Sequence, residues 1–350
     1  MEYRALGRTG ISVSHLTLGA MMLGAMGNQD REECVRSVHR ALDQGVTSIN
    51  TADGYSGGES EQIIGEALSG GRRDEVVLSV KTGVMLDGNP NHGGGSRRWF
   101  TQAVEGSLRR LQTDYIDVYE LGAPDPQTDL DETLGALTDL VAAGKVRSLG
   151  TSKMPPSQIA EARGLAERRG HGVFRTEEAP YSMVNRVVEY DLLPVCQRLG
   201  VGVLAFGALA GGWLSGRYRS GQPVARSGPR SHRPQMDASA PANASKFAAA
   251  DALGALADEH GLTLVQLATA WAAHHPAVSS VVIGPRTMQH LDGYLAADNI
   301  DLSDDVLDRV DAIVAPGVTL DPADTMWVHG TRALDATQRR RRTSSIPTPT

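Results

Sequence analysis

The chain has few cysteines, few aromatic residues and no excess of positive charge. Its 350 residues include 2 cysteines and 5% aromatic residues, and its formal net charge is −7. Cys34 and Cys196 lie far apart in predicted helices, which fits buried side chains in a reducing compartment better than a disulfide. The acidic balance provides no general basic surface for nucleic acid or an anionic membrane.

Membrane and export signals are also missing from the sequence. No run reaches the ~20 apolar residues of a membrane span, and the opening residues Met1–Arg4 lack the apolar stretch of a signal peptide. We therefore expect a cytoplasmic protein that binds a small-molecule substrate, without nucleic acid, membrane or metal. The sequence shows no heptad pattern from which an oligomeric state follows.

One strongly basic run is present, near the end of the chain. Arg339–Arg342 lies among serine, threonine and proline residues, a composition that cannot build a core. We expect residues 331–350 to be a disordered tail and residues 1–330 to form one domain.

Within that domain, short apolar runs alternate with amphipathic stretches of helical period, the pattern of a parallel sheet. The predicted strands are His15–Gly19, Ser48–Asn50, Val76–Val80, Ile116–Leu121, Ser148–Thr151, Arg175–Ala179, Val201–Ala205 and Ser279–Ile283. The predicted helices are Arg31–Gln44, Ser60–Leu68, Trp99–Leu111, Asp131–Ala143, Pro156–Arg169, Glu189–Leu199, Lys246–His260 with Leu264–His274, and Thr287–Ala296. Eight such units predict a closed (β/α)₈ TIM barrel of the α/β class.

Further features refine this barrel. Residues 1–14 contain two short extended segments around Gly7–Gly10 and predict a hairpin that closes the bottom. Asp131 is expected to cap the helix that follows it, and Pro156 to occupy a first helical turn. Two long loops, Met85–Arg98 and residues 207–245, leave the carboxyl ends of strands, where barrel enzymes build their sites.

An acid, a phenol and an amine meet at these strand ends. Asp53 and Tyr55 follow the second predicted strand, and Lys81 follows the third. A nearby ammonium favours phenolate and so lowers the pKa of a tyrosine, while a carboxylate keeps the lysine charged. We therefore predict that Tyr55 is a general acid or base, tuned by Lys81 and Asp53.

With these motifs in place, the sequence resembles the aldo-keto reductase superfamily, and particularly its bacterial members with a long loop after the seventh strand. The resemblance covers nearly the whole chain, and its motifs form a specific set: Leu6–Gly10, Thr17–Met21, Gly57–Glu61, Ser107–Leu111, Leu209–Tyr218, Ile283–Thr287 and Val314–Gly317.

The resemblance implies an NADPH-dependent oxidoreductase in which Tyr55 protonates a carbonyl oxygen. It also implies that Tyr181 stacks on the nicotinamide, that Ser152 and Glu178 face the carboxamide, and that Arg286 and His290 hold the 2′-phosphate. The cofactor-binding residues expected in this way are Met21, Ser152, Glu178, Tyr181, Leu209, Gly211, Leu214, Gly216, Arg217, Gly284, Arg286 and His290. Met22, Trp99 and Gly122 are expected in the substrate pocket.

Departures from the family pattern gather around the reacting end of the cofactor. Gly122 occupies the position of the family's substrate-orienting histidine, Glu178 replaces a glutamine, and Gly207-Ala208 replaces Ser-Pro. Loss of an oxyanion donor typically costs on the order of 10²–10³ in rate. A water or a substrate hydroxyl could occupy the space at Gly122. Lys153 could offset the charge of Glu178, and it is equally consistent with the sequence that Lys153 and Glu178 are both solvated.

Three functions follow as hypotheses. The first is reduction of an aldehyde, a ketone or a sugar- or polyketide-like carbonyl by an atypical site. The alternative is a redox-neutral isomerase, dehydratase or cyclase that uses Tyr55 and Lys81 for proton transfer. The third is a non-catalytic, nucleotide-sensing or partner-binding subunit.

Overall fold

Eight parallel strands close into a barrel in the computed structural model, which describes residues 1–84, 87–222, 224 and 234–325. Neighbouring strands follow the order β10-β3-β4-β5-β6-β7-β8-β9, so the barrel closes between β10 and β3. The (β/α)₈ prediction is confirmed. The barrel strands are β3 Leu16–Gly19, β4 Ser48–Ala52, β5 Val77–Thr82, β6 Ile116–Leu121, β7 Val146–Ser152, β8 Phe174–Pro180, β9 Gly202–Phe206 and β10 Val278–Ile283.

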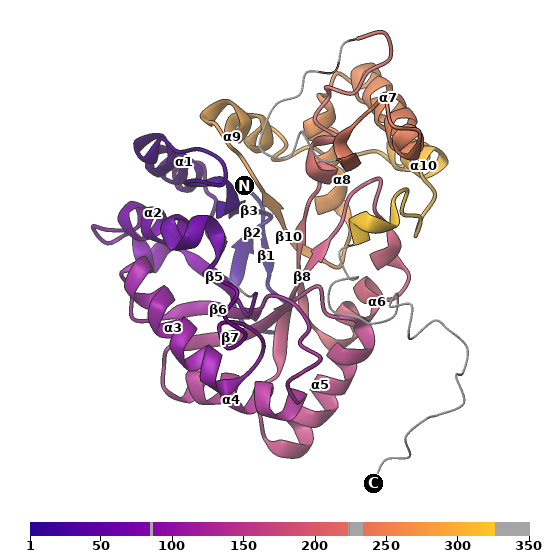
Figure 1. Cartoon of the computed structure of the whole chain (residues 1–350). Coiled ribbons are helices and arrows are strands. Elements are labelled where there is room, and N and C mark those ends of the chain that lie inside the picture. Colours follow the sequence, from indigo (N-terminus) through magenta and orange to yellow (C-terminus); the bar gives the residue numbers. More distant parts are fainter. Residues whose placement is uncertain (85–86, 223, 225–233, 326–350) are drawn as a thin grey trace, which may run out of the picture.

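Helices surround this barrel (Figure 1). They are α1 Arg31–Asp43, α2 Glu59–Ala67, α3 Arg97–Leu111, α4 Leu130–Ala142, α5 Pro156–Arg169, α6 Leu192–Leu199, α7 Ala244–Glu259, α8 Leu264–His274, α9 Met288–Leu295 and α10 Asp304–Ile313. α10 was not predicted. In the part of the chain that the structure describes, none of them has the length and apolar character needed to cross a bilayer. The predicted tail, residues 331–350, and residues 225–233 of the long loop lie outside the described residues.

Side-chain caps begin several of these helices. Asp30 accepts a hydrogen bond from the backbone N–H of Glu33, and Ser96 accepts one from that of Trp99, as N-cap residues do. The predicted cap at Asp131 is wrong. α4 begins one residue earlier, and the Asp131 carboxylate instead contacts His171 Nε2 at 3.0 Å. Pro156 occupies the first turn of α5, as predicted.

The amino-terminal hairpin closes the bottom of the barrel. β1 Tyr3–Ala5 pairs antiparallel with β2 Ser12–Ser14. Leu6 and Val13 from this hairpin pack with Val118 and Leu204 from the barrel interior, and all four side chains are buried. The predicted hairpin plug is therefore confirmed, and it leaves the carboxyl ends of the strands as the open face of the barrel.

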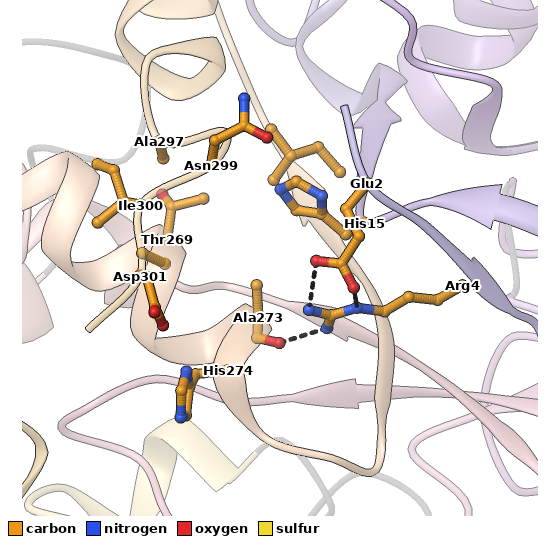
Figure 2. Close-up of a pocket in the computed structure, with 12 residues that line it drawn as sticks. Glu2, Arg4, His15, Thr269, Ala273, His274, Ala297, Asn299, Ile300 and Asp301 are labelled. Atoms are coloured by element: carbon orange, nitrogen blue, oxygen red, sulfur yellow. Dashed lines mark hydrogen bonds and ion pairs between the residues drawn. The ribbon is translucent and has the colours of Figure 1, made fainter. Parts of the chain in front are cut away.

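A polar cavity of about 230 Å³ lies at this closed end, between the hairpin, α8 and the segment after α9 (Figure 2). Its Arg4 guanidinium donates to both carboxylate oxygens of Glu2, at 2.8 and 3.0 Å, and to the carbonyl oxygens of Ala273 and Val278. These contacts join β1 to the barrel. The residues that line the cavity therefore help to anchor the hairpin.

The barrel interior becomes strongly polar toward its open face. Thr17 contacts Ser48 and Ser280 through hydroxyl oxygens, each at 2.6 Å. Above them Asn50 and Glu120 are buried. β4 and β5 extend two residues beyond their predicted ends, so Lys81 lies inside β5 rather than after it. Its side chain consequently projects among the interior polar groups.

Gly150 in β7 makes room for the buried carboxyl group of Glu120. A Cβ atom at position 150 would contact the Thr176 hydroxyl and would lie 2.8 Å from Cγ of Glu120. The Thr176 hydroxyl also donates a hydrogen bond to Glu120 Oε1 at 3.2 Å. The space at Gly150 and the position of Glu120 therefore depend on each other.

We predict that Gly150→Ala destabilises the protein by about 1–3 kcal/mol, because the added methyl group overpacks the interior. Gly293→Ala is the matched control, since a Cβ atom there meets nothing within 4 Å. Urea unfolding of both variants checks this. Equal effects of the two substitutions would contradict the assigned role of Gly150.

Glu177 on β8 is a second buried acid. Its side chain lies on the face of β8 that is opposite to the barrel interior. Its carboxylate accepts hydrogen bonds from the Thr151 hydroxyl at 2.5 Å and from the backbone N–H of Met154 at 3.0 Å. Burial raises the pKa of Glu177 to about 8, against the lowering effect of these donors. Glu177 therefore links the end of β7 to β8, and its contribution to the free energy of unfolding depends on pH.

We predict that Glu177→Gln gains stability relative to the wild type as pH rises from about 5 to about 8. In this range the unfolded chain has released the Glu177 proton while the folded chain still holds it, so the unfolding free energy of the wild type falls by up to about 1.4 kcal/mol per pH unit. Urea titrations at both pH values measure the difference. A difference that stays constant with pH would disprove the raised pKa.

Candidate functional site

Tyr55 and Lys81 come together at the open end of the barrel. Tyr55 begins a short 3₁₀ turn, Tyr55–Gly58, two residues after Asp53, and Lys81 is the penultimate residue of β5. The Lys81 ammonium lies 5.2 Å from the centroid of the Tyr55 ring. Lys81 and Asp53 are buried, whereas Tyr55 is only partly buried. The predicted phenol–amine pair is therefore present.

The counter-ion of Lys81 differs from the one expected. Lys81 Nζ lies 2.8 Å from Glu178 Oε2, 2.5 Å from Asn50 Oδ1 and 3.2 Å from the Thr51 carbonyl oxygen. Burial opposes the charge of Lys81, but the neighbouring acids outweigh it and raise the pKa of the ammonium. Glu178, which was expected to face the cofactor, thus holds the charge of Lys81, a role predicted for Asp53.

Asp53 takes part in a different series of hydrogen bonds. The Thr82 hydroxyl donates to Asp53 Oδ2 and accepts a hydrogen bond at 3.0 Å from Nε1 of Trp99. Burial raises the pKa of Asp53 to about 6, although the Thr82 bond lowers it. Trp99, predicted in the substrate pocket, is buried, and its ring stacks on His92 at 5.4 Å. Its indole therefore supports the position of Asp53 through Thr82.

The predicted low pKa of Tyr55 is wrong. Burial raises the pKa of the phenol above its ordinary value, and the charge of Lys81 lowers it only in part. Negative charge on Glu178 and Glu120 adds to the upward shift. The phenol is accordingly held in its protonated form at neutral pH, which suits a proton donor.

Gly122 directly follows β6 at the same end of the barrel. Its backbone N–H donates to the Thr82 carbonyl oxygen at 2.7 Å, and a Cβ atom at position 122 would lie 2.9 Å from that oxygen. Met22 ends a 3₁₀ turn, Ala20–Met22, that follows β3, so it too lies at the open face. Both predicted pocket residues therefore reach the rim of the barrel.

Tyr181 is not brought to this site. Its hydroxyl donates to Glu189 Oε1 at 2.7 Å, and its ring packs against Trp271 with the centroids 4.8 Å apart. Phe206, the last residue of β9, is the register partner of Pro180 and Val282, and strand alternation places its side chain toward the barrel interior. Phe206 was not predicted, although the alternation of β9 could have identified it.

Ser152 and Glu178 are direct register partners on β7 and β8, so they face the same side of the barrel. Lys153, which follows Ser152 in the chain, has a left-handed φ of 59°. Its backbone N–H donates to the Glu178 carbonyl oxygen at 3.0 Å. Burial lowers the pKa of Lys153, and Glu178 opposes that shift. The ion pair of Glu178 is nevertheless with Lys81.

The segment after β9 folds in tight turns. Gly211 and Gly216 have φ values of 68° and 85°, and Leu214 N–H donates to the Leu209 carbonyl oxygen. The Leu214 side chain is in the core, while Nε of Arg217 donates to the Ser215 hydroxyl at 2.8 Å. Leu209 is partly buried against the core.

A basic cluster surrounds the start of α9. Burial lowers the pKa of His290, and the positive charges of Arg286 and Arg217 lower it further, so the three side chains are close enough to interact. Gly284 ahead of them has open space where a Cβ atom would be. Met21 lies in the turn after β3, which neighbours β10. The phosphate-binding role of Arg286 and His290 stays a prediction.

Comparison with known proteins agrees with this arrangement. Residues 15–315 match the model of the Aldo/keto reductase family. The chain is 32% identical to aldo-keto reductase YhdN of Bacillus subtilis (82% of this chain, 85% of that protein) and 34% identical to the uncharacterized oxidoreductase YrpG of the same organism (91% and 97%). It is also 34% identical to a probable voltage-gated potassium channel subunit beta of rice, Oryza sativa subsp. japonica (90% and 97%). The chain belongs to the aldo/keto reductase family of oxidoreductases.

Proposed function

We propose that this protein is an NADPH-dependent reductase of an aldehyde, a ketone or a sugar- or polyketide-like carbonyl, in which Tyr55 is the proton donor. The observation that carries the proposal is the Tyr55 ring 5.2 Å from the buried Lys81 ammonium at the mouth of a family barrel. A phenol held in the acid form is equipped to protonate an oxygen that gains negative charge.

The residues present fit a phosphorylated dinucleotide. The guanidinium groups of Arg286 and Arg217, together with His290, supply the positive charge that a 2′-phosphate requires. Open space at Gly284 and Gly216 allows a ligand to approach the backbone closely. Phe206 offers an aromatic surface at the barrel mouth, where the nicotinamide would lie.

NADPH, when bound, supplies the hydride to the carbonyl carbon. Tyr55 donates its hydroxyl proton to the carbonyl oxygen, and the phenolate that remains is stabilised by the neighbouring Lys81 until it regains a proton from solvent. Because Gly122 carries no side chain, we propose that a water or a hydroxyl of the substrate orients the carbonyl there. Asp53 is held by Thr82 and supports this corner of the site.

We predict that Tyr55→Phe lowers kcat for carbonyl reduction by about 10²–10⁴, because the proton donor is removed while the ring remains. The measurement follows NADPH oxidation and alcohol formation over a panel of carbonyl substrates. A folded, NADPH-binding wild type without turnover on that panel would contradict the proposal. Product formed without net NADPH consumption would identify the redox-neutral alternative.

We predict that Arg286→Ala raises KM for NADPH by about 10–100-fold and leaves KM for NADH nearly unchanged, since the charge-assisted contact with the 2′-phosphate is lost. Arg163→Ala is the matched control, because Arg163 lies on α5 in an ion pair with Glu167. If KM rose equally for NADPH and NADH, the assigned role of Arg286 in binding the 2′-phosphate would be wrong.

A further inference from the structure

The ammonium of Lys81 is held inside the barrel by an acid that lies across it. Glu178 comes from β8 and Lys81 from β5, yet their charged atoms are 2.8 Å apart. Asn50 Nδ2 donates to the same Glu178 oxygen at 3.1 Å, while Asn50 Oδ1 accepts from Lys81. Lys81, Glu178 and Asn50 therefore form one buried network whose acceptors draw the ammonium toward the barrel axis.

The charge of Glu178 acts on Tyr55 against that of Lys81. Lys81 favours the phenolate, whereas Glu178 and Glu120 disfavour it. Glu120 from β6 has a pKa raised to about 8 by burial and by Glu178, so it is mostly neutral at neutral pH and becomes charged in alkaline solution. The charged and titratable groups that face this network are Tyr55 beside β4, Lys81 on β5, Glu120 on β6, Lys153 after β7 and Glu178 on β8.

We propose that Glu178 is a positioning residue that binds Lys81, offsets its charge at Tyr55 and thereby extends to higher pH the acid form of Tyr55 that carbonyl reduction requires. This inference rests on the proposed function of Tyr55 as proton donor. In reduction the Tyr55 O–H bond breaks and the proton passes to the carbonyl oxygen, while the reverse reaction needs the phenolate to accept a proton from the alcohol. A group that opposes phenolate formation keeps Tyr55 in its acid form to higher pH, so it moves the alkaline limit of reduction and the acid limit of oxidation upward.

The test compares Glu178→Gln with the wild type. Glutamine keeps the shape of the side chain and removes its charge, so we expect the Tyr55 pKa to fall by about one pH unit, which corresponds to a tenfold change in its ionisation. Glu120, ionised in alkaline solution, takes over part of the pairing with Lys81 and limits the shift. Glu178→Asp retains the charge and is expected to shift the Tyr55 pKa less.

Two measurements report this pKa. The first is an alkaline titration of tyrosinate absorbance, in which the Tyr55 contribution is the difference from a Tyr55→Phe version of each variant. The second is the pH profile of kcat in both reaction directions with one carbonyl–alcohol pair. The alkaline limb of reduction and the acid limb of oxidation are both expected to move to lower pH in Glu178→Gln.

Glu177→Gln is the matched control, because it also neutralises a buried acid on β8 but faces away from Tyr55. We expect its tyrosinate titration to match that of the wild type. An unchanged Tyr55 titration in Glu178→Gln, or equal shifts in both variants, would overturn the inference. Since the absorbance titration needs no turnover, it still tests the role of Glu178 if the carbonyl reductase activity itself is absent.

Discussion

The ion pair between Lys81 and Glu178 is the constraint on which the site depends. A charged group inside a protein needs a partner of opposite charge, and its remaining protons or lone pairs need hydrogen-bond partners. Lys81 obtains these from strands on different sides of the barrel, so the closed sheet brings the partners together. Burial raises the pKa of Tyr55 and of Glu120, and the charge of Glu178 in this pair raises both further.

Most of the fold follows from the sequence, because alternating apolar runs and helical periods extend over eight units. Apart from α10, which was not predicted, the errors lie at the ends of elements. β4 and β5 continue past their predicted ends because Ala52 and Lys81 still form a register pair, which sequence periodicity does not reveal. α4 begins before Asp131, and the carboxylate expected to cap it contacts His171, a partner 40 residues away that the local sequence does not reveal.

The proximity of Tyr55 and Lys81 was also predictable, but the electrostatics around them were not. Spacing placed Tyr55 and Lys81 on one face, since parallel strands share that edge. The basic residues near α9 were expected only from the family resemblance. Spacing could not show that Glu178 reaches Lys81 across the barrel, nor that burial outweighs the lysine at Tyr55. Tyr181 was predicted at the cofactor and Phe206 was not, because the sequence does not show that the Tyr181 hydroxyl binds Glu189 or that Phe206 is in register with Pro180.

The hydrogen bond from Gly122 to Thr82 limits how this enzyme can change. Any side chain at position 122 brings its first carbon within 2.9 Å of the Thr82 carbonyl oxygen, so β5 and β6 must separate to admit it. An imidazole therefore cannot be installed there by one substitution in an otherwise unaltered scaffold. Directed evolution toward a histidine-containing site would first need to alter the spacing of these two strands, and its early steps would be neutral or harmful.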